Sequence, residues 1–364
     1  MKDWLTSFAD QAELSDQLRA RKNHVLLLAA GLYGESGSVL AELKKSQREG
    51  TAYPHYRQRL TEEFGDALWY FVRLVSACDP ELLDALPRAV RSELPTEESI
   101  AFSLRLGAAV GDVLRCVQKG PSSELRMLLL SFWTQLLVLA TKAGVELEAA
   151  AAANVTKVHS RWPATRQFCA LLDESFPDEE QLPRVLTVEF HERRRGNRVE
   201  VLLRYQGITI GDRLTDNISD PDGYRYHDIF HMAYAVFLGW SPVTRALLRC
   251  KRKSQPAIDE NEDGARASIL EEAVSAVIFS RAKNMHYFER ATELDYDMLK
   301  NIQEIVRGYE VARVPLWQWE RAILEGFRVF RLLCSNQGGA VSWNLRERLL
   351  EWSPIEATQH GGAA

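Results

Sequence analysis

Carboxylates at helical spacing occur in two neighbouring segments of the first 70 residues. Glu35 and Glu42 are seven residues apart, with Ser38 between them. Further along the chain, Glu63 and Asp66 are three residues apart. At about 100° per residue, each set lies on one face of a helix. Carboxylates that converge inside a helical bundle repel one another and lose solvation unless a cation neutralises them. The pattern therefore predicts a site for a hard divalent ion, Mg²⁺ or alternatively Mn²⁺.

The acids belong to a helical hairpin that the chain repeats. Residues 37–45 align without a gap with residues 111–119, and residues 60–82 align with residues 125–147 at a different offset. A helical hairpin cannot bury its apolar face alone, so two of them predict a four-helix bundle.

Any one of these glutamates, taken alone, is better interpreted as a surface carboxylate paired with a base such as Lys44, Lys45, Arg57 or Arg59. The second hairpin argues against that interpretation for the set. It replaces the four acids by Ala109, Cys116, Leu128 and Ser131. Their joint loss indicates that the acids form one functional unit, which is needed in only one copy.

Three segments of the first half resemble the MazG-like pyrophosphohydrolases. GLYGESGSVLAELKK (31–45) and LTEEFGDALWYF (60–71) are similar to the family signature of ExxE on one helix and ExxD on the next. GVELEAAAAANVTKVHSRWP (144–163) is similar to the segment that closes many such domains. The resemblance covers about residues 20–165. It implies an all-α enzyme that uses Mg²⁺ to cleave a nucleoside triphosphate between its α- and β-phosphates.

The resemblance also implies roles for the acids. Glu35, Glu63 and Asp66 are expected to hold the metal. Ser38 stands where the family has its second glutamate, so a neutral hydroxyl would bind the metal or a water with one negative charge fewer. Glu42, one turn further along, or Glu62 is expected to accept the proton of the attacking water.

The substrate side of the site is expected to come from four residues. Asn154, Lys157 and Arg161 match the NxxKxxxR spacing of the family, and the two bases would contact the polyphosphate. The alternative for these bases is a solvated helix end before Pro163. Trp69, or its neighbour Tyr70, would stack on the base of the nucleotide, unless both are core aromatics.

A second chemical pattern lies in the C-terminal half. HDIFH places His227 and His231 at positions i and i+4, with Asp228 beside them, and Glu271 or Glu272 could add a carboxylate. This spacing suits a transition-metal pair. Because the sequence defines no third ligand, we expect instead two buried or interface histidines tied to backbone and carboxylates, with no stoichiometric zinc. An independent metal-dependent hydrolase is the alternative.

The charge runs downstream of this histidine pair are not diagnostic by themselves. Basic residues cluster at 249–253 and acidic residues at 259–263, and opposite runs this close more often solvate a loop than bind phosphate or nucleic acid. Together with residues 224–242, they are similar to C-terminal extensions of some MazG-like proteins, from which no chemistry carries over.

Periodicity divides the chain into parts. Apolar residues recur at helical spacing from Ala12 to about Trp162, β-rich runs with a Gly-Asn turn occupy residues 182–210, and helical spacing returns after Pro221. We therefore expect a mainly α protein. Its parts are an N-terminal bundle domain (1–165), a linker (166–183), a mostly helical domain with a small β-hairpin (184–353) and a disordered tail (354–364).

Composition limits the classes of function. The chain has 364 residues and a formal net charge of -5, from 45 basic and 50 acidic residues. This balance argues against nonspecific electrostatic binding to nucleic acid or to an anionic membrane. Five separate cysteines and a charged start predict a soluble, cytoplasmic protein without disulfides. A nucleoside triphosphate is the expected partner, a homodimer is compatible, and a nucleotide sensor with reduced catalysis is the alternative function.

Overall fold

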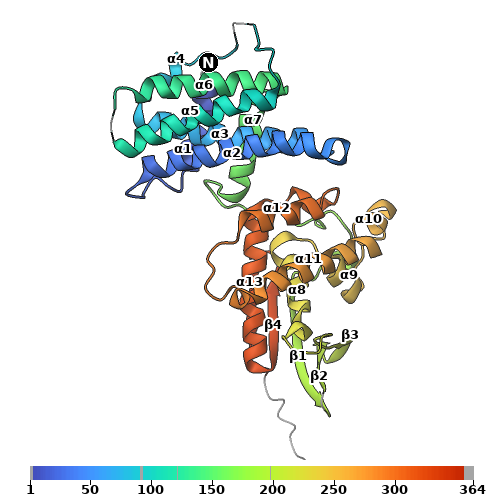
Figure 1. Ribbon diagram of the computed structural model, residues 1–364. Coiled ribbons are helices and arrows are strands. Elements are labelled where there is room, and N and C mark those ends of the chain that lie inside the picture. The colour runs from blue at the N-terminus through green and yellow to red at the C-terminus, as the bar shows by residue number, and fades with distance from the viewer. Residues whose placement is uncertain (1–2, 91–92, 121, 197, 356–364) are drawn as a thin grey trace, which may run out of the picture. The chain divides into compact units, whose positions relative to one another are not determined.

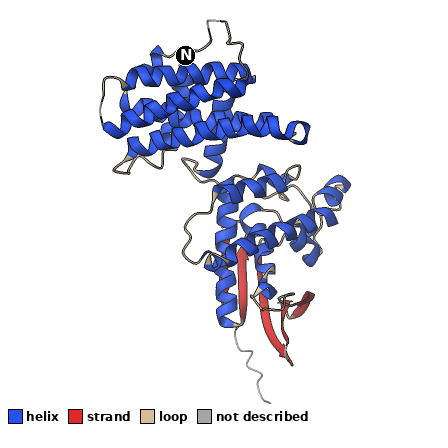
Figure 2. Cartoon of the chain, viewed as in Figure 1, coloured by secondary structure: helices blue, strands red, loops and turns tan. Residues whose placement is uncertain are grey.

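The protein folds into two compact units, Met1–Thr165 and Arg166–Ala364 (Figure 1). The computed structural model describes residues 3–90, 93–120, 122–196 and 198–355. Helices dominate both units, and the strands belong to the second one (Figure 2). The expected mainly α fold class is confirmed.

The described part of the first unit is all-helical. Its elements are α1 (Trp4–Leu14), α2 (His24–Glu49), η1 (Gly50–Ala52), α3 (Tyr56–Cys78), α4 (Leu82–Ala85), α5 (Ser99–Lys119), α6 (Leu125–Ala143) and α7 (Leu147–Arg161). Helix α2 packs against both α3 and α5, and α5 packs against α6. The two hairpins therefore form one four-helix bundle, and α7 adds a further helix against α3.

Apolar stripes at helical spacing form the core of this bundle. In α3, Phe64, Leu68 and Phe71 are fully buried, and the Phe71 ring stacks on Trp133 of α6 at 5.3 Å between ring centroids. In the second hairpin, three of the four positions that lack acids, Ala109, Cys116 and Leu128, are buried or partly buried, whereas Ser131 is exposed. Leu128, which replaces Glu63, is a partly buried member of the bundle core. The second hairpin thus contributes packing where the first presents carboxylates.

The second unit mixes helices with strands. Its elements are η2 (Asp178–Glu180), β1 (Val185–Arg195), β2 (Arg198–Tyr205), β3 (Ile208–Leu214), η3 (Tyr224–Tyr226), α8 (Asp228–Leu238), α9 (Pro242–Leu248), α10 (Pro256–Asn261), α11 (Ala265–Lys283), η4 (His286–Phe288), α12 (Tyr296–Ile305), η5 (Glu310–Arg313), α13 (Leu316–Asn336), β4 (Gly338–Asn344) and β5 (Leu349–Ser353). Every residue of α8 from Ile229 to Leu238 is buried. A helix that is apolar all round belongs in a core, and α8 packs along α13 there.

The sheet is larger than the predicted hairpin. Five antiparallel strands run in the order β3-β2-β1-β4-β5, so two strands from the end of the chain complete it. Gly338 has φ +122, and a Cβ there would lie 2.2 Å from the Phe190 carbonyl oxygen. Glycine thus permits the β1–β4 pairing, but a short glycine-rich segment carries little strand signal. The predicted tail begins at Pro354, and its residues 356–364 lie outside the described part.

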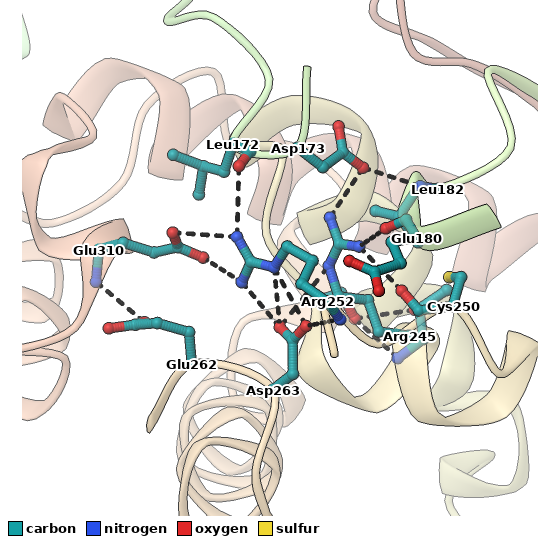
Figure 3. A network of polar contacts seen from close by, with 12 residues as sticks. Leu172, Asp173, Glu180, Leu182, Arg245, Cys250, Arg252, Glu262, Asp263 and Glu310 are labelled. Atoms are coloured by element: carbon teal, nitrogen blue, oxygen red, sulfur yellow. Dashed lines mark hydrogen bonds and ion pairs between the residues drawn. The ribbon is translucent and has the colours of Figure 1, made fainter. Parts of the chain in front are cut away.

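The segment 166–183 is an integral part of the second unit, although we expected a linker. Leu171 and Leu182 are buried in the core of this unit. Asp173 is 1% exposed, forms an ion pair of 2.8 Å with Arg245 and accepts a hydrogen bond of 2.7 Å from the Leu182 amide (Figure 3). The composition of this segment is like that of a linker. Its contacts could not be predicted from it, because the groups that hold it, such as Arg245, come from distant elements.

The charge runs are also partly buried, so the expectation that they solvate a loop is wrong for Arg252, Glu262 and Asp263. Arg252, 1% exposed, donates to Asp263 at 2.7 Å and to Glu310 at 2.5 Å (Figure 3). Its Nη1 also donates to the Leu172 carbonyl oxygen at 3.3 Å. This network ties the segment before η2, the loop before α11 and η5 to one another.

Two features bear on the compartment of the protein. By length and apolar composition alone, the helical stretches His24–Ala52 and Leu125–Ala143 are able to cross a membrane. This is weak evidence, because both pack in the bundle and the core helices of other proteins pass the same test. All five cysteines are free.

Candidate functional site

Helices α2 and α3 bring three of the predicted acids together. One carboxylate oxygen from each of Glu35, Glu63 and Asp66 lies within 4.8 Å of the others. All three residues are half-buried, so the carboxylates keep a route to solvent. Adjacent helices with acids on their facing stripes produce this convergence, as the spacing predicts.

Helix α7 adds a cation and an amide to the same point. Lys157 Nζ donates to both carboxylate oxygens of Asp66, at 2.5 Å to Oδ2, and lies 3.6 Å from Glu62 Oε1. Asn154 Nδ2 donates to Asp66 Oδ1 at 2.7 Å. Within the described chain, the buried Oδ1 of Asn154 has no hydrogen-bond partner. Asp66 is thus the meeting point of all three helices.

The electrostatics of the cluster show an excess of negative charge. Burial raises the pKa of Glu35, and the charge of Asp66 raises it further, against the opposing effect of Lys157. Burial likewise raises the pKa of Asp66 despite its contacts with Lys157. Burial and mutual repulsion thus oppose the charged forms of Glu35 and Asp66, and a cation bound beside them would favour those forms.

A pocket of about 590 Å³ opens beside this cluster. It shares Glu62, Asn154 and Lys157 with the surroundings of Asp66 and extends along the start of α3. Its other lining residues are Pro54, His55, Arg57, Gln58, Thr61 and Ala153. Arg57 is positioned by a hydrogen bond of 2.8 Å from its Nη1 to the Gly144 carbonyl oxygen. The pocket thus offers cationic and neutral hydrogen-bond donors next to the carboxylates.

The second unit holds a separate cluster at the start of α8. One ligand atom each from His227, Asp228 and His231 lies within 4.8 Å of the others. The Nδ1 of His227 lies 2.9 Å from the Tyr224 carbonyl oxygen, and the Nδ1 of His231 lies 2.9 Å from Glu271 Oε1. Burial lowers the pKa of His231, but the charge of Glu271 with that of Glu272 outweighs it and raises this pKa well above its usual value.

The family described as the MazG C-terminal domain matches residues 167–356, which is more than half of the chain. The chain belongs to this family. The match contains the His227 cluster and the buried ion network, but not the acids of the first unit. No curated protein and no solved structure is significantly similar to the chain.

Outside the MazG C-terminal domain, two of the predicted residues have partners other than the acids. Glu42 accepts a hydrogen bond from the Tyr53 hydroxyl, and it lies two helical turns, about 10 Å, beyond Glu35. Trp69 donates its indole N–H to Ser15 Oγ at 3.1 Å. Glu42 is therefore bound at the far end of α2, and Trp69 is tied to the end of α1.

The other predicted residues, Ser38 and Arg161, each lie one helical turn from a residue of the cluster. Ser38 is half-buried one turn beyond Glu35 on α2. Arg161 lies one turn beyond Lys157, with its guanidinium 4.4 Å from the centre of the Trp162 ring. Tyr70 is affected by the acids: burial raises its pKa, and the charges of Glu35 and Asp66 raise it further.

One residue that sequence reasoning missed is Gly65, between Glu63 and Asp66. A Cβ at this position would lie 2.8 Å from the Ala150 carbonyl oxygen and 3.1 Å from Asn154 Cβ. The bare backbone therefore allows α7 to approach α3 closely, which brings Asn154 and Lys157 to Asp66. A glycine inside a strongly helical, acid-bearing segment was the available signal.

Gly65→Ala is expected to displace α7 and to lower any turnover at this site on the order of 100-fold, because a shift of about 1 Å misplaces catalytic groups. The overpacking should also cost about 1–3 kcal/mol of stability. Gly111→Ala is the matched control, since a Cβ there meets no heavy atom of the described chain within 4 Å. Steady-state rates and thermal unfolding of both variants test this prediction. Equal effects of the two substitutions would show that the close packing of α7 on α3 at Gly65 is unimportant.

Proposed function

We propose that the first unit is a Mg²⁺-dependent nucleoside triphosphate pyrophosphohydrolase, releasing a nucleoside monophosphate and pyrophosphate. One observation carries this proposal: three carboxylates from α2 and α3 converge beside the amide and ammonium of α7, next to a pocket lined by a further cation, Arg57. Membership of the MazG C-terminal domain family supports it, because that domain is related to nucleotide pyrophosphohydrolases.

The donor set fits a hard divalent ion. Glu35, Glu63 and Asp66 would hold it through carboxylate oxygens, and the unpartnered Oδ1 of Asn154 offers another oxygen acceptor to a bound water. The chemistry that Mg²⁺ would supply there is neutralisation of the acids, stabilisation of charge on the phosphates and a lower pKa for a bound water. Ser38 would contribute a hydroxyl where a fourth carboxylate is the family pattern.

The side chains around the acids have distinct tasks in this proposal. A water attacks the α-phosphorus, the bond to the bridging oxygen breaks, and pyrophosphate leaves. Glu62, which lines the pocket 3.6 Å from Lys157, is better placed than Glu42 to accept the proton of that water. Arg57 and Lys157 bind the polyphosphate by charge-assisted hydrogen bonds. Tyr70 replaces Trp69 as the aromatic beside the acids.

A second candidate function is a nucleotide sensor with reduced catalysis. Ser38 favours it, since a hydroxyl gives the site one negative charge fewer than the four-acid pattern. Such a protein would bind nucleoside triphosphates with Mg²⁺ but release little product.

Product analysis of the full-length protein separates these functions. The protein is incubated with each NTP and dNTP plus Mg²⁺ in ¹⁸O-labelled water, and the products are resolved by ion-exchange chromatography. The enzyme should yield pyrophosphate and a monophosphate that carries the ¹⁸O label, because water attacks the α-phosphorus. Nucleoside diphosphate with labelled orthophosphate would contradict the proposal. Saturable nucleotide binding without product would indicate the sensor.

A further inference from the structure

His227 and His231 of the second unit both direct their Nε2 atoms to the same side of α8. Each uses its Nδ1 for an oxygen atom elsewhere, the Tyr224 carbonyl for His227 and the Glu271 carboxylate for His231. The Nε2 atoms remain, and the rings lie 5.7 Å apart between centroids at 80° to each other. Positions i and i+4 on α8 therefore direct two imidazole nitrogens to one side of the helix.

The carboxylates of Asp228 and Glu272 lie close to these two Nε2 atoms. His227 Nε2 lies 3.4 Å from Asp228 Oδ1 and 3.8 Å from Glu272 Oε2, and His231 Nε2 lies 3.3 Å from Glu272 Oε1. His231 is 1% exposed, and its Nε2 has no hydrogen-bond partner with acceptable geometry among the described residues. The nearest partner of this buried nitrogen is the partly exposed Glu272 carboxylate at 3.3 Å, and a metal ion shared with the neighbouring ligand groups would supply a direct partner.

We propose that His227, Asp228, His231 and Glu272 bind one divalent first-row transition-metal ion, a site distinct from the acids of the first unit. Two imidazole nitrogens with two carboxylates suit Zn²⁺, Mn²⁺ or Fe²⁺, whereas Mg²⁺ and Ca²⁺ prefer oxygen ligands alone. The proposal does not rest on the function of the first unit.

The surroundings hold the ligands in place. Glu271 is 0% exposed and accepts hydrogen bonds from Ser241 Oγ at 2.7 Å and the Val243 amide at 2.8 Å. It is thereby fixed to orient His231, as carboxylates and carbonyls behind metal-bound histidines do. Tyr224 stacks on the His227 ring at 4.5 Å and 2°. The ligands are thus preorganised by a buried helix and by groups behind both rings.

The site is open on one side. The Glu272 side chain is 43% exposed, whereas those of both histidines are nearly buried. A cavity of about 10 Å³ meets Asp228 and His231 and is otherwise lined mainly by apolar side chains. That is about the space for one water molecule. With four protein ligands, an ion here would bind water only as a fifth ligand, and this cavity has the space for it.

Metal analysis of the untagged full-length protein tests the proposal. After chelation and dialysis, the protein is titrated with Zn²⁺ and, separately, with Co²⁺ in the presence of excess Mg²⁺. We expect about one equivalent of tightly bound metal and a Co²⁺ absorption spectrum typical of nitrogen and oxygen ligands at low coordination number. Mg²⁺ should not displace it. Failure to bind either ion would overturn the proposal and leave His231 as an imidazolium held between Glu271 and Glu272.

Three variants locate the ion. Glu272→Gln removes a partly exposed ligand without opening the core and should weaken Zn²⁺ binding at least about 10-fold. Glu271→Gln should weaken it about 10–100-fold through the orientation of His231. His191→Ala removes a half-buried histidine paired with Glu189 on β1 and is the control for adventitious binding. If Glu272→Gln binds Zn²⁺ as the wild type does while His191→Ala loses it, the assignment is wrong. Circular dichroism verifies that each variant is folded.

Discussion

Asp66→Asn is expected to reduce nucleoside triphosphate hydrolysis by a factor on the order of 1,000, with the helical circular dichroism unchanged. Asp66 joins α2, α3 and α7, since it lies with Glu35 and Glu63 and accepts from Asn154 and Lys157. The amide has nearly the same shape but no charge. It should therefore weaken cation and phosphate binding together, and the rate of monophosphate release at increasing Mg²⁺ measures this.

The second hairpin supplies the control for that substitution. Asp112 aligns with Ser38, pairs with Arg115 on the surface of α5 and has no part in the acid cluster. Asp112→Asn makes the same chemical change and should leave the rate within about two-fold, as surface ion pairs contribute little. Wild-type turnover of Asp66→Asn at saturating Mg²⁺ would remove the metal site from this position.

The part of the acid site that the sequence predicts is the part that follows from helical geometry. Glu35, Glu63 and Asp66 converge because residues three or four apart share a helix face. The same rule also placed Glu42 and Trp69 near the site, but each is engaged elsewhere by a side chain from another segment, Tyr53 or Ser15. Periodicity predicts which face of a helix a residue occupies. It does not predict how far along the helix axis the site lies, or which side chain of another segment contacts the residue.

The second unit shows a different limit of sequence reasoning. HDIFH gives the spacing of His227 and His231, yet Glu271 and Glu272 come from α11, about 40 residues later. Nothing local distinguishes a ligand from a structural histidine, because the difference lies in which ring nitrogen is already bonded. Strands β4 and β5 were missed for a related reason: β4 pairs with β1, which lies far from it in the chain, and β5 pairs with β4.

Asp263→Asn is expected to destabilise the second unit by about 3–5 kcal/mol, because it removes one partner of a buried ion pair. Asp263 is 0% exposed and accepts from the Arg252 amide at 2.8 Å and from Arg252 Nη2 at 2.7 Å, with Arg245 Nε at 3.7 Å (Figure 3). Two guanidiniums therefore depend on this carboxylate. Scanning calorimetry should show a lowered transition, with faster hydrogen exchange in residues 172–184 and 249–264.

Two further variants separate loss of the pair from loss of an acid. Glu260→Gln changes an exposed member of the same acidic run and should shift unfolding by no more than about 0.5 kcal/mol. Combining Arg252→Gln with Asp263→Asn should cost less than the sum of the single changes, since neither charge is then left buried without its partner. Strictly additive costs, or an unchanged transition for Asp263→Asn, would contradict a stabilising network. The segment before η2 would then be held by its apolar side chains, Leu171 and Leu182, rather than by its charges.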